Sequence, residues 1–251
     1  MTGDALHGRR IDVHTHNGAM PNIHFLATPE DLERVEREAG VEKAIVSSAR
    51  AVFYDMITGN EETFAITRVS AMLYMYIYVD PHRVGASLDQ MERYEGQPHV
   101  AGIKTRHGYH GMPGDCDEYL TLFKAAATLE LPCLAHAYSR QEVSELHRAA
   151  EKTGEKIILA HMGAAQWKAS VDTVKGSRLV WLDASVSYNE YDKIRYALDV
   201  LGASRLVFGS DSALLSPWWT ISMFESAGLT DDERRAIYRG NALAIFGRRL
   251  E

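Results

Sequence analysis

Two histidines near the amino terminus are the residues of this chain best placed to carry out chemistry. His14 and His16 lie one residue apart in Asp12-Val13-His14-Thr15-His16, which directly follows the start of a short apolar stretch. In an extended strand the side chains of residues i and i+2 point to the same face, so both imidazoles can reach one metal ion. The same pattern, an apolar run that ends in His or Asp, recurs three times and predicts further ligands at His136, His161 and Asp211.

The elements that must position these side chains are predicted from the rest of the chain. Apolar runs alternate with longer amphipathic stretches, and runs without strict alternation are typical of parallel strands buried on both faces. No Gly-x-Gly-x-x-Gly motif follows the first run, which disfavours an open dinucleotide-binding sheet. We therefore predict a closed (β/α)₈ TIM barrel, an α/β fold, as a single domain over residues 1–251. Its expected strands are residues 11–16, 43–47, 71–79, 100–105, 132–136, 156–161, 179–184 and 205–209.

Helix signals fall between these strands. Thr28-Pro29-Glu30-Asp31 predicts an N-cap with proline at the first helical position, and Gly40 predicts the end of that helix. Thr230 and Glu233 form a capping-box pattern that opens a last helix running to Phe246. Apolar residues at helical spacing predict further helices over residues 117–130, 140–153 and 193–201. The irregular residues 49–68 are expected to form a small insertion, with an extra helix at 61–67 over the barrel mouth.

The barrel explains the spacing of the candidate ligands. His161 follows His136 by 25 residues, and Asp211 follows His161 by 50, which correspond to one and two βα units. The candidates therefore fall at the carboxyl ends of strands one, five, six and eight. Active sites of such barrels lie at this end.

Composition excludes several classes of function. The 251 residues carry a net charge of -7, and no Lys/Arg-rich run argues for nucleic acid or a membrane surface as a partner. No apolar stretch approaches the ~20 residues that span a bilayer, and the polar amino terminus lacks the apolar region of a signal peptide. The two cysteines, Cys116 and Cys133, do not suggest a disulfide framework. We therefore expect a cytoplasmic enzyme acting on a small molecule.

On these motifs the chain resembles the amidohydrolase superfamily, in the amidohydrolase-related branch that includes aminocarboxymuconate-semialdehyde and resorcylate-type decarboxylases. The resemblance rests on Asp12-Val13-His14-Thr15-His16, His136, His161 and Gly209-Ser210-Asp211, and on the tail from Gly240 to Gly247. It covers nearly the whole chain. It implies a metal-dependent enzyme, commonly a homodimer, and leaves the reaction open because the branch contains both hydrolases and non-oxidative decarboxylases.

The ligand chemistry indicates a divalent ion. Imidazole and carboxylate suit zinc, manganese or iron, and the lack of a thiolate cluster argues against a structural zinc site. We assign Zn²⁺ as the expected cofactor, with Mn²⁺ or Fe²⁺ as alternatives. The assigned ligands are His14, His16, His136 and Asp211, with one position open to water, and Asp211 is also expected to relay a proton to the leaving group.

Two residues have alternative roles. His161 is either the catalytic base that orients water or a ligand of a second ion, and the resemblance to mononuclear members favours the base. Lys104 ends the fourth expected strand and either holds substrate or, as in binuclear relatives, is carboxylated and bridges two metals.

Substrate contacts are expected from loops at the strand ends. Arg50 and Arg106 follow strands two and four, and either guanidinium could bind a substrate carboxylate in bidentate fashion. The substrate is therefore expected to be a small molecule that bears a carboxylate. Weaker candidates on the same loops are His24, His107, His110, Trp167, Tyr188, Trp218 and Trp219.

Three functions are compatible with these residues. The first is a hydrolase in which metal-activated water attacks an amide, ester or lactone. The second is a metal-dependent decarboxylase of a small unsaturated or aromatic acid, which two carboxylate-binding arginines would favour. The third is a barrel that has lost catalysis and only binds ligands, which the complete ligand set argues against.

Overall fold

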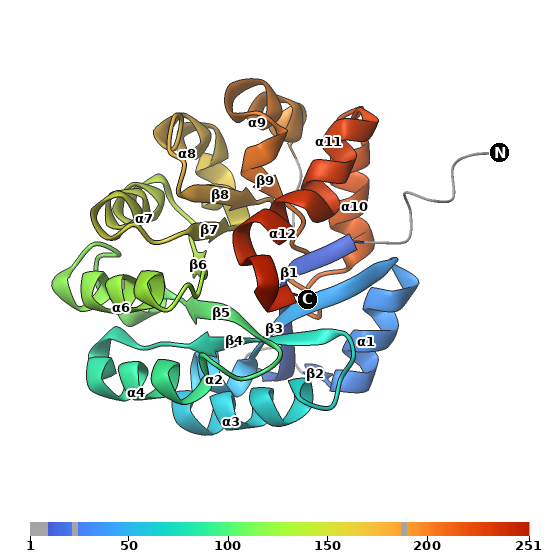
Figure 1. Ribbon diagram of the computed structural model, residues 1–251. Helices are drawn as coiled ribbons and strands as arrows, with labels where there is room; N and C mark the ends of the chain where they lie inside the picture. The colour runs from blue at the N-terminus through green and yellow to red at the C-terminus, as the bar shows by residue number, and fades with distance from the viewer. Residues whose placement is uncertain (1–9, 22–24, 187–189, 251) are drawn as a thin grey trace.

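The predicted (β/α)₈ barrel is the observed fold (Figure 1). The computed structural model describes residues 10–21, 25–186 and 190–250. Parallel strands follow one another around the barrel in chain order. The short strand β2 (Phe25–Ala27) pairs antiparallel with the carboxyl end of β1. The barrel strands are β1 (Arg10–Met20), β3 (Val41–Ser48), β4 (Leu73–Tyr78), β5 (Val100–Thr105), β6 (Cys133–His136), β7 (Ile157–Ala160), β8 (Val180–Asp183) and β9 (Leu206–Val207).

The ring closes between β1 and the segment that follows β9. The Val13 amide donates to the Phe208 carbonyl at 3.0 Å, and the Asp211 amide donates to the His14 carbonyl at 2.8 Å. Thr15 and Ser212 form an isolated parallel bridge farther along. The seam of the barrel therefore runs directly through the candidate metal ligands.

Helices surround the strands, as Figure 1 shows. The Thr28 hydroxyl caps α1 and Thr230 with Glu233 forms a complete capping box on α11, so both predicted helix starts are confirmed. None of the helices in the described part of the chain combines the length and apolar character that crossing a bilayer requires. The helices are α1 (Pro29–Glu38), α2 (Ala49–Phe53), α3 (Met56–Thr67), α4 (Val84–Tyr94), α5 (His107–His110), α6 (Asp117–Thr128), α7 (Arg140–Thr153), α8 (Trp167–Thr173), α9 (Lys193–Leu201), α10 (Pro217–Glu225), α11 (Asp231–Arg235) and α12 (Asn241–Phe246).

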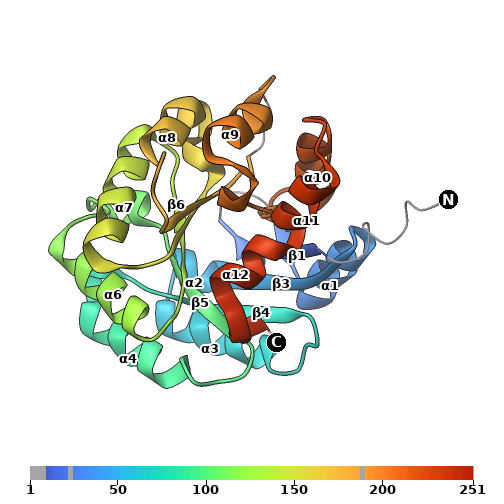
Figure 2. The same cartoon turned by 45° about the horizontal axis from the view of Figure 1, so that its top comes forward.

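The carboxyl-terminal helix α12 crosses the amino-terminal end of the barrel (Figures 1 and 2). Its Ile245 and Phe246 join the apolar cluster inside the strands, and the Phe246 ring lies 6.1 Å from that of Tyr76 on β4. Burial of this apolar surface closes one end of the barrel. The helix therefore covers the end of the barrel opposite to the candidate ligands.

Several expected boundaries were wrong. Residues 61–67 belong to α3, which lies in the outer ring of helices in Figure 1. The shorter α2 lies at the mouth, where its Val52 and Phe53 line the cavity. The stretch expected as one last helix is α11 and α12 joined by a π-helical turn, Ala236–Gly240. The last strand is only two residues long, because the chain leaves regular pairing before it reaches Asp211.

Candidate metal centre and active site

His14 is the most firmly oriented residue of the site. Its Nδ1 lies 2.6 Å from Asp183 Oδ2 and 3.2 Å from Ser185 Oγ, all within the buried interior. The carboxylate fixes the proton on Nδ1 and leaves Nε2 as the nitrogen with the lone pair, the arrangement found for metal-binding histidines. That nitrogen lies 3.3 Å from Asp211 Oδ1.

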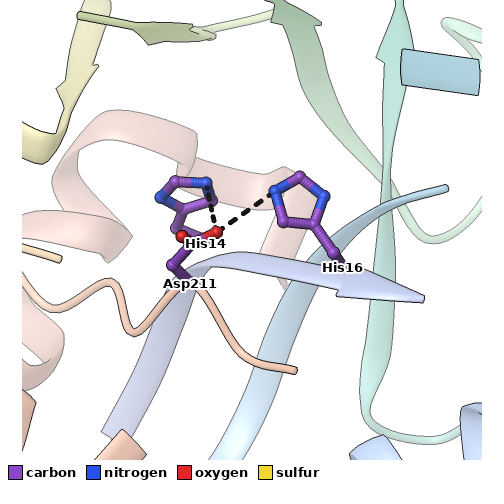
Figure 3. A group of neighbouring side chains, drawn as sticks. All are labelled: His14, His16 and Asp211. Carbon is purple, nitrogen blue, oxygen red and sulfur yellow. Dashed lines mark ion pairs between the residues drawn. The ribbon is translucent and has the colours of Figure 1, made fainter. Parts of the chain in front are cut away.

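His16 points to the same carboxylate, as Figure 3 shows. Its Nδ1 contacts Ser47, at 3.0 Å from the hydroxyl and 3.2 Å from the carbonyl, and its Nε2 lies 3.3 Å from Asp211 Oδ1. One ligand atom each from His14, His16 and Asp211 lies within 4.8 Å of the others. Two imidazoles and a carboxylate at this spacing fit a divalent ion such as zinc or manganese.

The protonation of the group also suits a cation. Burial lowers the pKa of His14 and of His16, so both rings are neutral at neutral pH. Burial alone would raise the pKa of Asp211, but the neighbouring imidazoles hold the pKa of this carboxyl below its ordinary value. The three side chains therefore present two lone pairs and one negative charge to a cation.

Asp211 reaches the site through an unusual backbone conformation. Its φ is +60°, in the left-handed region, and its position is fixed by the hydrogen bond from its amide to His14. Asp12 Oδ1 accepts from the amides of His14 and Ser210, at 2.9 and 3.1 Å. The buried Asp12 carboxyl thus fastens both sides of the seam.

His161 lies beside this group. It follows β7 instead of ending it, and its φ of +68° turns the ring into the barrel mouth, 5.1 Å from the His14 ring. Its Nδ1 lies 2.5 Å from the Ser185 carbonyl, so Nδ1 carries the proton and Nε2 keeps the lone pair. Burial lowers the pKa of His161, which keeps the ring neutral and able to accept a proton.

His136 lines the same cavity but lies outside the group of three. Its ring is 4.8 Å from that of His161 and stacks on Tyr138 at 4.7 Å. Its Nδ1 is buried without a hydrogen-bond partner among the described residues. The structure thus brings His136 to the site without placing it against His14 and His16.

Lys104 is buried at the end of β5, with Nζ 3.2 Å from His14 Nε2. Burial lowers its pKa to about 8, although Asp211 acts in the opposite direction. The ammonium therefore donates to the same lone pair of His14 that a metal ion would use. The Lys104 side chain and an ion on His14 can coexist only if this hydrogen bond is given up.

These residues enclose a small cavity, of about 90 Å³, at the barrel mouth. Arg106 lines it and makes no ion pair with the described residues; its guanidinium carbon lies 3.4 Å from the ring centre of Tyr109 and 4.6 Å from that of Phe53. Arg50 does not line it. The Arg50 side chain is 51% exposed and its Nη1 lies 2.9 Å from Glu62 on α3, so Arg50 is not carried into the site.

A protein-family model described as amidohydrolase matches residues 11–248. The chain belongs to the amidohydrolase family. This membership confirms the resemblance drawn from its histidine and aspartate motifs. No curated protein matches the sequence.

Solved structures share the fold of this amidohydrolase-family chain at low sequence identity. A 5-carboxyvanillate decarboxylase from Sphingomonas paucimobilis has a TM-score of 0.75 at 14% identity, covering 95% of this chain and 98% of its own. A candidate 2-pyrone-4,6-dicarboxylic acid hydrolase from Pseudomonas putida has a TM-score of 0.69 at 18%, covering 95% and 97%. A dihydroxybenzoic acid decarboxylase from Polaromonas, with bound manganese, has a TM-score of 0.74 at 16%, covering 95% and 97%. The likeness establishes the barrel and leaves the reaction open.

Sequence reasoning missed Asp183 and Ser185, which orient the amidohydrolase histidines. Asp183 ends the seventh barrel strand after an apolar run, the same signal that identified the other ligands. Gly209 leaves room for it, because a Cβ there would lie 2.7 Å from the Asp183 carboxyl carbon. Of the weaker candidates, His24 and Tyr188 lie outside the described residues, and Trp167, Trp218 and Trp219 do not line the cavity.

A larger cavity, of about 470 Å³, lies at the other end of this amidohydrolase barrel, between α12 and the residues that precede β6 and β7. It lacks converging imidazoles among its lining residues. Because barrel enzymes act at the carboxyl ends of their strands, we place the site at the smaller cavity.

Proposed function

We propose that this protein is a metal-dependent hydrolase of a small ester, lactone or amide that carries a carboxylate. The observation that supports it best is the fixed His161, whose Nε2 lone pair is directed away from Ser185 and beside the His14, His16 and Asp211 group. A base held next to a cation site is the arrangement that water activation requires.

A divalent ion bound by His14, His16 and Asp211, with His136 as a further ligand, would supply Lewis acidity. Zn²⁺ is the proposed ion; the manganese in the Polaromonas structure makes Mn²⁺ the main alternative. Within the chain, His161 removes a proton from the attacking water, and the ionised Asp211 carboxylate relays that proton to the leaving group. Lys104 adds positive charge where negative charge develops on the substrate oxygen.

The carboxylate assignment rests on Arg106. Among the described residues Arg106 has no acidic partner, and its buried Nε has no hydrogen-bond partner. Such an arginine at the edge of a cavity favours an anionic ligand. The name of the Pseudomonas neighbour describes a cyclic ester with two carboxylates. That compound, 2-pyrone-4,6-dicarboxylate, is therefore our first probe substrate.

The second candidate is a non-oxidative decarboxylase. Four of the similar structures are decarboxylases of aromatic acids, and a carboxylate held by Arg106 would lie beside the proposed metal ligands. Two carboxylate-binding arginines would have favoured this reaction. Arg106 lines the cavity, but Arg50 pairs with Glu62 and does not.

One assay separates these functions. The zinc- or manganese-loaded protein is incubated in H₂¹⁸O with 2-pyrone-4,6-dicarboxylate, and separately with 5-carboxyvanillate and 2,6-dihydroxybenzoate. We expect ring opening of the pyrone with one ¹⁸O in the new carboxyl group and no CO₂. Release of CO₂ from an aromatic acid, with solvent hydrogen at the vacated carbon, would instead establish the decarboxylase. Ligand binding without turnover of any probe would indicate a binding barrel.

Replacing Arg106 with methionine is expected to raise KM for a carboxylate-bearing substrate about 100-fold with a smaller change in kcat, since a charge-assisted hydrogen bond contributes ~1.5–3 kcal/mol. Steady-state kinetics measure the effect. Arg50→Met is the matched control and should change KM less than about twofold. Equal effects of the two substitutions would remove Arg106 from substrate binding.

A further inference from the structure

The short helix α5 lies at the barrel mouth and carries the aromatic ring that contacts Arg106. It begins directly after this arginine, and the Tyr109 amide donates to the Arg106 carbonyl at 2.9 Å. The Tyr109 ring lies 3.4 Å from the guanidinium carbon and 5.7 Å from the His136 ring. A single helical turn is not stable by itself in water. Contacts from outside α5 must therefore hold Arg106 and Tyr109 in place.

His110, the last residue of α5, makes such contacts with both nitrogens of its ring. Nδ1 lies 2.7 Å from the Tyr119 hydroxyl on α6, and Nε2 lies 3.1 Å from the Tyr78 hydroxyl at the end of β4. The Tyr119 hydroxyl also lies 2.9 Å from Thr105 Oγ1 at the end of β5. Tyr119 is 0% exposed and Tyr78 is 2% exposed, so both belong to the packed interior. His110 thus ties α5 to fixed points on the barrel.

The backbone of His110 has a further partner. His82 Nε2 donates to the His110 carbonyl at 2.8 Å, from the 3₁₀ turn Pro81–Arg83 that follows β4. The next residue, Gly111, has a φ of +65°, in the left-handed region that favours glycine, and there the chain leaves α5. The turn is therefore bounded by Arg106 at its start and by the fixed His110 at its end.

The ionisation states suit these hydrogen bonds. Burial lowers the pKa of His110 to about 4, although Asp80 acts in the opposite direction. Burial raises the pKa of Tyr78 and of Tyr119, so both hydroxyls keep their protons. A neutral imidazole offers one N–H and one lone pair. Each ring nitrogen of His110 can therefore pair with one of the two hydroxyls at pH 7.

We propose that His110 is a positioning residue for substrate binding, which fixes the Arg106 guanidinium at the cavity by holding α5. Neither His110 nor His107 is among the residues that line the cavity, so His110 acts through Arg106 and does not touch the substrate. The inference rests on the proposed function, which assigns Arg106 to the substrate carboxylate. An arginine that is already ordered loses less conformational freedom when a ligand binds, so the affinity for a carboxylate depends on the His110 contacts.

Calorimetric titration of the zinc-loaded protein with isophthalate tests this dependence. Isophthalate is a planar dicarboxylate without an ester, lactone or amide, so its binding is measured without hydrolysis. We expect His110→Phe to raise Kd about tenfold and Arg106→Met to raise it about 100-fold. His147→Phe is the matched control, because His147 pairs with Glu151 on α7, away from the cavity. It should leave Kd unchanged.

The double variant Arg106→Met/His110→Phe separates positioning from general destabilisation. If His110 acts through Arg106, its substitution has no further effect once the guanidinium is gone, and the double variant binds isophthalate like Arg106→Met alone. Losses that multiply would overturn the proposal, as would an unchanged Kd in His110→Phe alone. Failure of the carboxylate assignment gives a different result, because Arg106→Met would then leave Kd unchanged.

Hydrogen exchange of the amides gives a measurement that needs no ligand. In His110→Phe we expect residues 107–111 to exchange about tenfold faster or more, while α1 keeps its wild-type rates. Unchanged protection of residues 107–111 would show that His110 does not hold the turn, whatever the substrate is. If His110→Phe fails to fold, Tyr78→Phe, which removes a single hydroxyl from the ring contacts, carries both tests.

Discussion

The His14→Ala/His16→Ala variant is expected to lose one equivalent of divalent metal and to fall roughly 10⁴-fold in kcat/KM. Both imidazoles present Nε2 to Asp211 Oδ1 at 3.3 Å, and their removal leaves at most Asp211 and His136, too few ligands to hold an ion. Loss of the Lewis acid removes several kcal/mol of transition-state stabilisation. Elemental analysis of the purified protein and steady-state kinetics in metal-buffered solution measure the two effects.

Full metal content in this double variant, at the level of the wild-type chain, would contradict the ligand assignment. Single variants sharpen the result. Each single variant removes one imidazole from Asp211. His14→Ala also unpairs the buried Asp183 carboxyl, whereas His16→Ala unpairs the neutral Ser47, so the first should lower Tm more than the second.

His161→Asn is expected to keep its metal and to lose about 10²- to 10³-fold in kcat. Asparagine can still donate to the Ser185 carbonyl, but it offers no basic nitrogen at the position of Nε2. The loss of a general base has an effect of this size. Kinetics and metal analysis are made on the same preparation.

The same substitution at His147, on the outer face of α7, serves as control and should leave kcat unchanged. Turnover near the wild-type value in His161→Asn would remove His161 from the mechanism. Loss of metal in this variant would instead assign His161 as a ligand, the alternative role that sequence left open.

The barrel and the position of its site could be predicted because both depend on strand periodicity. His14 and His16 share a face by the geometry of any extended strand, and the carboxyl ends of parallel strands must meet. Asp183 obeys the same rule and was overlooked because one acid at the end of an apolar run resembles an ordinary strand terminus. Its role becomes visible only when the barrel brings it 2.6 Å from His14.

Other features depend on backbone conformations and partners that sequence does not encode locally. His161 and Asp211 adopt positive φ, which few side chains do, and only the surrounding hydrogen bonds hold them there. Arg50 has the residue type and position of a carboxylate ligand, but a glutamate twelve residues later directs its side chain outward. The π-helical turn between α11 and α12 changes the hydrogen-bond pattern while the apolar spacing still looks helical.

The closure of the ring between β1 and the residues after β9 also determines when the candidate ligands come together during synthesis and folding. The ribosome synthesises β1, with His14 and His16, almost two hundred residues before it synthesises Asp211. A nascent polypeptide thus has no complete group of these three candidate ligands until Asp211 has been synthesised. On the proposed ligand assignment, the ion binds only after the ring has closed between β1 and the residues that follow β9.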